Sequence, residues 1–358
     1  MAYTTINKST DYFNTKLYEG NGSSPRSITG VGFQPDWTWT KNRDNTNGHG
    51  LFDAVRGYAT GKGLSTHNTN AEGSADGYGY LSSRDSDGYT MTAGGSSMTM
   101  NNTNGESYVS WNWKAGTTSI PSGSTSDPSA VSINTTAGFG IYKITAPGSG
   151  NYVLKHGLGA TPAMVIVKRT DGTQKWMVWH KTFSNATDDY LSLNSNAAKA
   201  TYSTCWGTMN STDCTIATGG TLDTSAEHII YVFTEKTGYS KFGSYTGNGN
   251  ADGTFVYTGF KPSWLMIKQT NSTENWHIFD IKRNPYYPTS SSYGGMATRL
   301  MANLNNADDL SQGGFRFLSN GLKMTTSWSG GNGSGDTFIY MCFGQSLVGL
   351  NNTPCTSR

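Results

Sequence analysis

Two pairs of adjacent aspartates, Asp188 with Asp189 and Asp308 with Asp309, are the clearest candidates for acid–base chemistry in this sequence. Glycoside hydrolases use two carboxylates about 5 to 10 Å apart, one as the acid and the other as nucleophile or base. Adjacent side chains on a strand point to opposite faces, so neither pair converges on one bond. Both pairs lie in Asn-rich and Ala-rich segments that favour turns or helix starts. We therefore expect no catalysis from either pair.

Histidines, cysteines and the remaining acidic residues give no stronger catalytic or metal-binding signal. His180 and His277 lie in aromatic strand segments, where hydrogen-bonded structural imidazoles are expected. Cys205 and Cys214 could bridge across a hairpin in an oxidising medium, or remain buried thiols in a reducing cytosol. The run from Asp85 to Gly88 resembles half of a calcium loop but lacks the closing glutamate, so we expect a turn. The sequence predicts neither a metal nor a cofactor.

Composition predicts the elements that carry these residues. The chain has 45 Gly, with 12% aromatic and only 14% charged residues. Its apolar runs are short, rich in Val, Ile, Trp, Tyr and Phe, and bounded by Gly, Asn and Ser clusters, a pattern typical of strands and turns. We predict an all-β protein, in which only residues 194–200 and 296–303 could form a short helix or turn.

One sequence pattern occurs three times. Each copy has a turn, a proline, an apolar run and a closing lysine, at residues 32–41, 160–168 and 259–268. Three further anchors follow in the same order: an aromatic strand at 49–53, 176–180 and 276–280; a short strand at 87–92, 213–218 and 320–325; and a long strand at 108–113, 228–233 and 338–343. The interval is too long for a solenoid, so each copy should be a domain. We predict three tandem antiparallel β-sandwich domains of about 100 residues, each large enough to enclose one core.

The expected domain organisation has five parts. We place repeat 1 with an N-terminal segment at residues 1–116, a linker at 117–136, repeat 2 at 137–240, repeat 3 at 241–348 and a C-terminal tail at 349–358. The stretch from Ala115 to Thr136 is rich in Ser, Thr, Gly and Pro and should be exposed. Repeats 2 and 3 follow with hardly a break. We therefore expect them to dock closely, with repeat 1 as the looser partner.

Charge and targeting signals narrow the surroundings. The net charge is +2, and lysines and arginines are scattered singly, which argues against nucleic-acid binding. The first eight residues have no apolar core of a signal peptide, and no run is long enough to cross a membrane. We expect synthesis and folding in a cytoplasm, without membrane insertion.

Several segments show a family resemblance. Residues 1–18, 30–36, 49–57 and 245–249 resemble tail-fibre-like virion proteins of tailed bacteriophages, which are built from repeated domains of uncharacterised function. The second unit departs from the pattern, with residues 179–182 in place of a Phe-Asp-x-x-Arg-Gly element, and so does the tail at 349–358. The resemblance implies a structural protein of the virion, synthesised in the host cytoplasm, and assigns no reaction.

The function expected from this resemblance is host adhesion as part of the tail fibre or adsorption apparatus. The alternatives are a purely structural head decoration, collar or tail adaptor, and a surface-polysaccharide depolymerase. Expected partners are other virion proteins, copies of the same chain with a trimer as the first candidate, and a host surface glycan. Because no heptad stretch could drive association, we expect residues 2–17 to be extended and to contact another chain.

Aromatic residues divide into core and contact candidates. Eight tryptophans fall in the repeated strands and should face the sandwich cores: Trp37, Trp39, Trp111, Trp113, Trp176, Trp179, Trp264 and Trp276. Tyrosines outside the repeat pattern lie in turn-rich stretches, where they would give rigid contact area for a sugar or another subunit. The candidate contact residues are Tyr58, Tyr78, Tyr80, Tyr286, Tyr287 and Tyr293.

Overall fold

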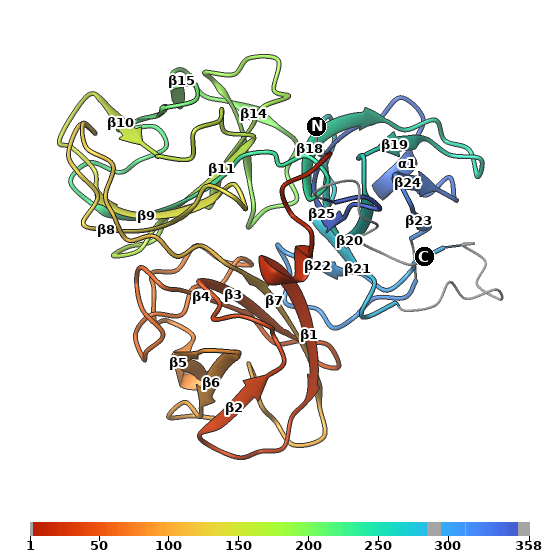
Figure 1. Cartoon of the computed structure of the whole chain (residues 1–358), viewed down its shortest axis with the longest axis horizontal. Helices are drawn as coiled ribbons and strands as arrows, with labels where there is room; N and C mark the ends of the chain where they lie inside the picture. Colours follow the sequence, from red (N-terminus) through yellow and green to blue (C-terminus); the bar gives the residue numbers. More distant parts are fainter. Residues whose placement is uncertain (1–2, 285–294, 312, 350–358) are drawn as a thin grey trace.

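The computed structural model describes residues 3–284, 295–311 and 313–349, and it confirms a mostly β protein built from antiparallel sheets. Helical geometry in these residues is limited to three short segments, η1 (Ser9–Asp11), η2 (Asp76–Tyr78) and α1 (Ser329–Asn332). The helices considered for 194–200 and 296–303 do not form, and β14 and β22 begin there instead. The sheets group into three lobes that meet at the centre of the molecule (Figure 1).

The first lobe, red to orange in Figure 1, has a four-stranded sheet in the order β1-β7-β3-β4 and a three-stranded sheet in the order β2-β6-β5. Its strands are β1 (Phe13–Glu19), β2 (Arg26–Thr29), β3 (Trp37–Asn42), β4 (His49–Asp53), β5 (Tyr80–Asp85), β6 (Gly88–Thr92) and β7 (Ser107–Trp113).

The second lobe, yellow to green, has a seven-stranded sheet in the order β14-β13-β12-β11-β17-β9-β8 and a three-stranded sheet in the order β10-β16-β15. Its strands are β8 (Ala130–Asn134), β9 (Phe139–Thr145), β10 (Asn151–Lys155), β11 (Met164–Arg169), β12 (Met177–His180), β13 (Asp189–Ser192), β14 (Ala200–Thr201), β15 (Trp206–Met209), β16 (Asp213–Ala217) and β17 (Glu227–Phe233).

The third lobe, teal to blue, has a five-stranded sheet in the order β18-β25-β20-β21-β22 and a three-stranded sheet in the order β19-β24-β23. Its strands are β18 (Ser240–Thr246), β19 (Phe255–Tyr257), β20 (Lys261–Gln269), β21 (His277–Asp280), β22 (Leu300–Met301), β23 (Phe315–Leu318), β24 (Gly321–Met324) and β25 (Thr337–Gln345).

Strand pairing in the three large sheets follows one register. The last long strand of each lobe pairs with the strand of the repeated proline motif, which in turn pairs with the aromatic strand that follows it. The register aligns Trp113–Trp37–Asp53 in the first lobe, Phe233–Met164–His180 in the second and Phe343–Trp264–Asp280 in the third. We call residues related in this way corresponding positions.

Each large sheet has apolar side chains on both faces. In β20, Leu265 and Ile267 pack inside the third lobe, whereas Trp264 and Met266 belong to a central core that all three lobes share. This division follows from the alternation of side chains along a strand. Burial of both faces also explains why β11 and β20 contain nearly continuous apolar runs, whereas β3 alternates Trp with Thr.

Most of the tryptophans lie in the central core. All eight are buried, so the prediction that they are core residues is confirmed. Their location differs from the expectation, because Trp37, Trp176 and Trp264, one from each lobe, face the other lobes rather than only the interior of their own lobe. The Trp37 ring lies 4.7 Å from that of Tyr231, and the Trp113 ring lies 5.7 Å from that of Trp264. The first lobe therefore contacts both others, where the sequence predicted a looser attachment.

The connection between the first two lobes is also more ordered than expected. Within the stretch expected as an exposed linker, Ala130–Asn134 forms β8 at the edge of the seven-stranded sheet. Thr117 bridges to Ile133 of this strand, and Ala115 is buried. Composition missed this strand because only Val131 and Ile133 supply its apolar face.

The N-terminal segment lies against its own chain, where the sequence predicted contact with another one. Phe13–Glu19 is the edge strand β1, and Ile6 is buried in the central core. Ser9 donates its N–H to Oε1 of Gln345 at 2.7 Å, and the Tyr3 hydroxyl donates to the Gly259 carbonyl at 2.7 Å. The segment thereby joins the first lobe to the third.

This placement predicts the effect of trimming Ile6. Because the side chain is 2% exposed in the central core, Ile6→Ala should lower the free energy of unfolding by about 2 to 5 kcal/mol. Lys8→Ala is the matched control: its side chain is 67% exposed, so the loss should be about 0.5 kcal/mol or less. Urea unfolding followed by tryptophan fluorescence measures both. Equal, small losses would show that the segment does not pack as described.

Candidate functional site

The polar residues of interest gather where the lobes join. One contact, from a ring nitrogen to a backbone carbonyl, occurs at every junction. His49, Trp176 and Trp276 occupy corresponding positions, and each directs a ring nitrogen at a carbonyl of the neighbouring lobe. The contacts are Trp176 Nε1 to Ser65 O at 3.1 Å, Trp276 Nε1 to Ser192 O at 3.0 Å, and His49 Nε2 to Met301 O at 3.1 Å. The second lobe thus binds the first, the third binds the second, and the first binds the third, which closes a ring.

His49 can take the place of a tryptophan because its tautomer is fixed. Trp39 Nε1 donates to His49 Nδ1 at 2.8 Å, so Nδ1 accepts and Nε2 carries the proton. Burial lowers the pKa of His49 well below its ordinary value, which keeps the imidazole neutral. This histidine is a junction donor rather than a base.

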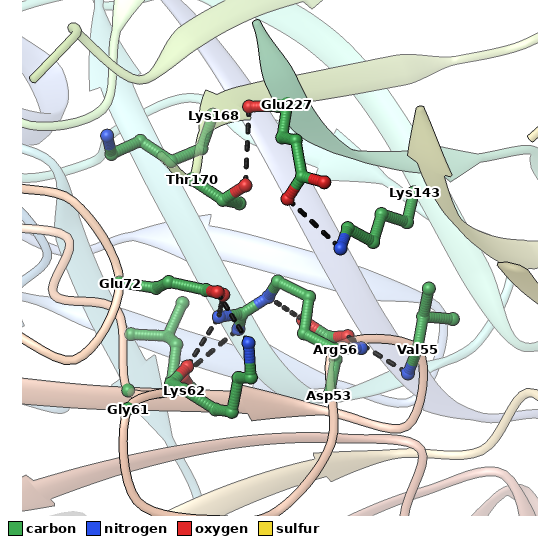
Figure 2. A network of polar contacts seen from close by, with 12 residues as sticks. Asp53, Val55, Arg56, Gly61, Lys62, Glu72, Lys143, Lys168, Thr170 and Glu227 are labelled. Atoms are coloured by element: carbon green, nitrogen blue, oxygen red, sulfur yellow. Dashed lines mark hydrogen bonds and ion pairs between the residues drawn. The ribbon is translucent and has the colours of Figure 1, made fainter. Parts of the chain in front are cut away.

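A buried ion pair lies beside the junction between the first and second lobes (Figure 2). Arg56 Nε contacts Asp53 Oδ2 at 2.7 Å, and Arg56 Nη1 contacts Glu72 at 3.1 Å. Asp53 also accepts the Arg56 backbone N–H at 2.8 Å and the hydroxyl of Tyr231 from the second lobe at 2.8 Å. Because both charges are paired and hydrogen-bonded, the cost of burying them is offset.

The same arrangement recurs between the third and first lobes. Arg283 Nε contacts Asp280 at 2.6 Å, and the donor from the neighbouring lobe is Trp111 Nε1, at 3.1 Å from Asp280. Trp111 and Tyr231 occupy corresponding positions. The Phe-Asp-x-x-Arg element therefore forms a carboxylate that accepts one hydrogen bond from the next lobe.

The remaining junction lacks both halves of this contact. In the second lobe His180 and Phe183 replace the aspartate and arginine, and in the third lobe Met341 replaces the donor. His180 bonds Thr182 Oγ1 through Nδ1 at 2.8 Å. The sequence departure in the second unit is thus matched by a departure in the lobe that faces it.

Three lysines close the repeated motifs, and all three are buried. Each ammonium donates to the carbonyl of the residue that follows it, at 2.6 Å from Lys41, Lys168 and Lys268. Burial lowers the pKa of Lys41 to about 7 and the pKa values of Lys168 and Lys268 to about 8. In Figure 2 the side chain of Thr170 is directed at Glu227 of its own lobe, and across the first junction the Glu72 N–H donates to the Thr170 carbonyl at 3.0 Å.

The aspartates singled out from the sequence are engaged in ion pairs or, for Asp188, in hydrogen bonds. Asp308 contacts Arg43 and Arg283, each at 2.8 Å, and so links the first and third lobes. Asp309 contacts Arg299 at 2.7 Å. In the second lobe Asp189 pairs with Lys199, and Asp188 accepts the Thr204 N–H at 2.9 Å.

The remaining histidine, turn and cysteine candidates also have structural contacts. His277 is buried with Nε2 3.0 Å from Glu274. Asp87 accepts the N–H groups of Gly30 and Gly32, as a turn residue does. Cys205 and Cys214 are free and buried, and burial raises the pKa of both thiols.

The tyrosines proposed as contact residues have different environments. Tyr58 is a correction: it is 7% exposed inside the first lobe, where its hydroxyl donates to Thr38 at 2.8 Å. Tyr80 packs partly against the same core. Tyr78 is 54% exposed at the edge of a cavity. Tyr286, Tyr287 and Tyr293 lie outside the described residues.

The cavity beside Tyr78 lies between the first and third lobes and has a volume of about 410 Å³. Its lining is polar and dominated by asparagine: Thr46, Asn47, Gly48, His67, Asn68, Asn70, Ser74, Ala75, Tyr78, Thr99, Met100 and Asn305. Within the described part of the chain its only titratable lining residues are His67 and Tyr78, and burial lowers the pKa of the His67 imidazole. Apart from Tyr78, the sequence interpretation missed this site, because asparagines in turn-rich segments are usually turn residues.

Comparison with known families agrees with the extent of this fold. The chain belongs to a family described as a domain of unknown function (DUF7483), whose model matches residues 8–346 and so runs through all three lobes. Searches of curated proteins and of solved structures found no match. In the described part of the chain, no helix is long and apolar enough to cross a membrane. Nor do three His, Cys, Asp or Glu side chains gather there as a metal site would require.

The buried ion pair leads to a stability prediction. Arg56→Met should lower the free energy of unfolding by about 3 to 5 kcal/mol, because it leaves the Asp53 carboxylate buried without its partner. Arg169→Met is the control: this arginine pairs with Asp171 and Asp223 on the surface and should contribute about 1 kcal/mol or less. Chemical denaturation compares the two. Similar losses would contradict a structural role for the buried pair.

The lowered lysine pKa values predict a dependence on pH. An unfolded lysine titrates near pH ~10.4, so between about pH 8 and 10 the unfolded chain binds more protons at Lys168 than the folded chain. The free energy of unfolding of the wild type, relative to that of Lys168→Met, should therefore rise across this interval. Other groups cancel in the difference. Urea unfolding at a series of pH values measures it, and a difference independent of pH would contradict the lowered pKa.

Proposed function

We propose that this chain is a structural protein of a phage virion, built from three copies of one β-sandwich closed into a ring, and that it belongs to the tail fibre or adsorption apparatus. The observation that carries the proposal is the closure itself. Corresponding residues, His49, Trp176 and Trp276, join each lobe to the next. Such an arrangement suits a rigid support that presents loops.

The contacts made by the titratable side chains support a binding or structural role over catalysis. The carboxylates, histidines and lysines considered above are engaged in ion pairs or hydrogen bonds with other residues of the chain, several of them at the lobe junctions. A depolymerase would need two carboxylates directed at one substrate bond. It therefore stays a second alternative, behind a head decoration, collar or tail adaptor.

The proposed partners follow from the surfaces that the three lobes leave exposed to solvent. The aromatic faces of the large sheets are covered within one chain, so a homo-oligomer, including a trimer, would have to associate through the outer faces of the lobes. Other virion proteins and a host surface glycan are the proposed contacts. Scattered charge with a net value of +2 disfavours nucleic acid, and we propose no membrane insertion.

The position of the chain on the particle tests this function. Antibodies against the purified chain should label the tail fibre or tail tip of a phage that encodes it, in immunoelectron microscopy. Particles of a phage without the chain are the control. Label on the head or collar would favour the purely structural alternative, and absence of the chain from washed particles would contradict a virion role.

A further inference from the structure

Two of the three lobe junctions share a second set of contacts. The loop that follows each closing lysine binds one carbonyl of the neighbouring lobe, through a backbone N–H and through the lysine itself. At the first junction Gln174 N and Lys168 Nζ bond Thr69 O, at 3.0 and 3.2 Å; at the second, Glu274 N and Lys268 Nζ bond Asn196 O, at 2.9 and 3.3 Å.

The junction between the first and third lobes is different. The corresponding residues there are Asn47, Lys41 and Asn305. Asn47 donates its N–H to Asn45 O at 2.9 Å, and Lys41 Nζ reaches Asn45 O at 3.4 Å. Among the hydrogen bonds of residues 3–284, 295–311 and 313–349, none joins Asn47 N or Lys41 Nζ to Asn305 O. This junction is open where the other two are closed.

A carboxylate in the first lobe accounts for the opening. Glu106 accepts Asn45 Nδ2 at 2.7 Å and also the side-chain amide of Asn42. Asn42 Oδ1 in turn accepts the N–H groups of Asp44 and Asn45, at 2.9 and 3.0 Å. These bonds hold residues 44–45 of the loop toward β7, while the Arg43 carbonyl accepts the Asp308 N–H at 2.7 Å across the junction. In the other lobes Arg169 and Gln269 stand in place of Asn42.

The cavity of about 410 Å³ lies at this opening, with Asn47 and Gly48 on one side and Asn305 on the other. Its size falls in the range of small-ligand pockets. A second cavity of the same volume, beside Gly116 and Pro121, has no aromatic residue in its lining. The opening between the first and third lobes combines polar groups from two lobes with an exposed tyrosine.

We propose that this cavity binds a neutral saccharide from the host surface. The side-chain amides of Asn47, Asn70 and Asn305 make no hydrogen bond within the described part of the chain, so they are available to sugar hydroxyls. Tyr78 is 54% exposed at the edge and can stack on the apolar face of a ring. The inference rests on the proposed adsorption role and gives it a specific site.

The charge of the lining selects among saccharides. Among the described residues, no Asp, Glu, Lys or Arg side chain lines the cavity, and burial with the nearby Lys41 charge lowers the pKa of His67. An acidic sugar would meet no cation at the surface of the cavity to replace its hydration. Neutral hexose and N-acetylhexosamine units are therefore the expected ligands.

The test uses the full chain on a printed array of neutral hexose and N-acetylhexosamine oligosaccharides, with uronic-acid oligosaccharides alongside. Calorimetry then measures the affinity of the neutral oligosaccharide that gives the strongest signal. Tyr78→Ala should weaken its binding about tenfold or more, by loss of stacking, and Asn305→Ala should also weaken it. Tyr202→Ala is the matched control, because Tyr202 is 53% exposed in the second lobe, and its affinity should be unchanged.

The other results test the site and the virion role separately. Preference for uronic-acid oligosaccharides would contradict a neutral ligand, and equal affinity of Tyr78→Ala and wild type would place any binding elsewhere. Absence of binding to every neutral oligosaccharide, from a chain that is nonetheless found on the tail, would reject the saccharide site and leave the proposed function intact. A chain that binds a neutral sugar through Tyr78 but is absent from particles would keep the site and reject the virion role.

Discussion

Three aromatic rings at corresponding positions, Trp113, Phe233 and Phe343, meet at the point where the lobes join. The Phe343 ring lies 5.9 Å from that of Trp113 and 6.2 Å from that of Phe233, so it contacts both other lobes. Each ring lies on the face of its large sheet that points toward the other two lobes. A separate lobe would expose this face to water, and burying aromatic area is among the largest stabilising contributions available to a fold of this size. The lobes therefore depend on one another.

Polar contacts at the edge of this core give the lobes their arrangement. An apolar interface tolerates sliding, whereas the indole donors of Trp176 and Trp276 must each find one carbonyl. The buried Asp–Arg pairs add a directional acceptor at two junctions. At the third, the aspartate, the arginine and the opposing donor are all replaced, which avoids burying a carboxylate or a guanidinium without its partner. The ring tolerates such differences because each junction is a separate set of contacts.

Much of the fold could be predicted from the sequence because it depends on local patterns. The proline, the aromatic strand and the closing lysine identified the central strands. Because these anchors occur in the same order in each copy, they also predicted which strands correspond between the lobes. Alternation along β20 separates Trp264 from Leu265, but it cannot say whether the tryptophan faces the interior of its own lobe or another lobe. That choice depends on contacts between distant segments. For the same reason Tyr58 was expected on the surface, although its hydroxyl meets Thr38 inside the first lobe.

The candidate site was harder to predict. Tyr78 was identified as an aromatic residue outside the repeat, but Asn47 and Asn305 come from different lobes and lie close only once the ring is closed. The opening also depends on Glu106, which directly precedes β7. Its carboxylate accepts a hydrogen bond from Asn45 in the loop between β3 and β4. No pattern in one segment carries that information. A comparison of corresponding positions across the three junctions does.

Hydrogen exchange on a variant of Phe343 tests the shared core most directly. Because Phe343 is buried among all three lobes, Phe343→Ala should speed amide exchange in β7, β17 and β20 together. Leu322→Ala, at a residue buried inside the third lobe alone, should act mainly on β19, β23 and β24. Faster exchange in the third lobe only, in both variants, would show that the three lobes fold independently and contradict the account.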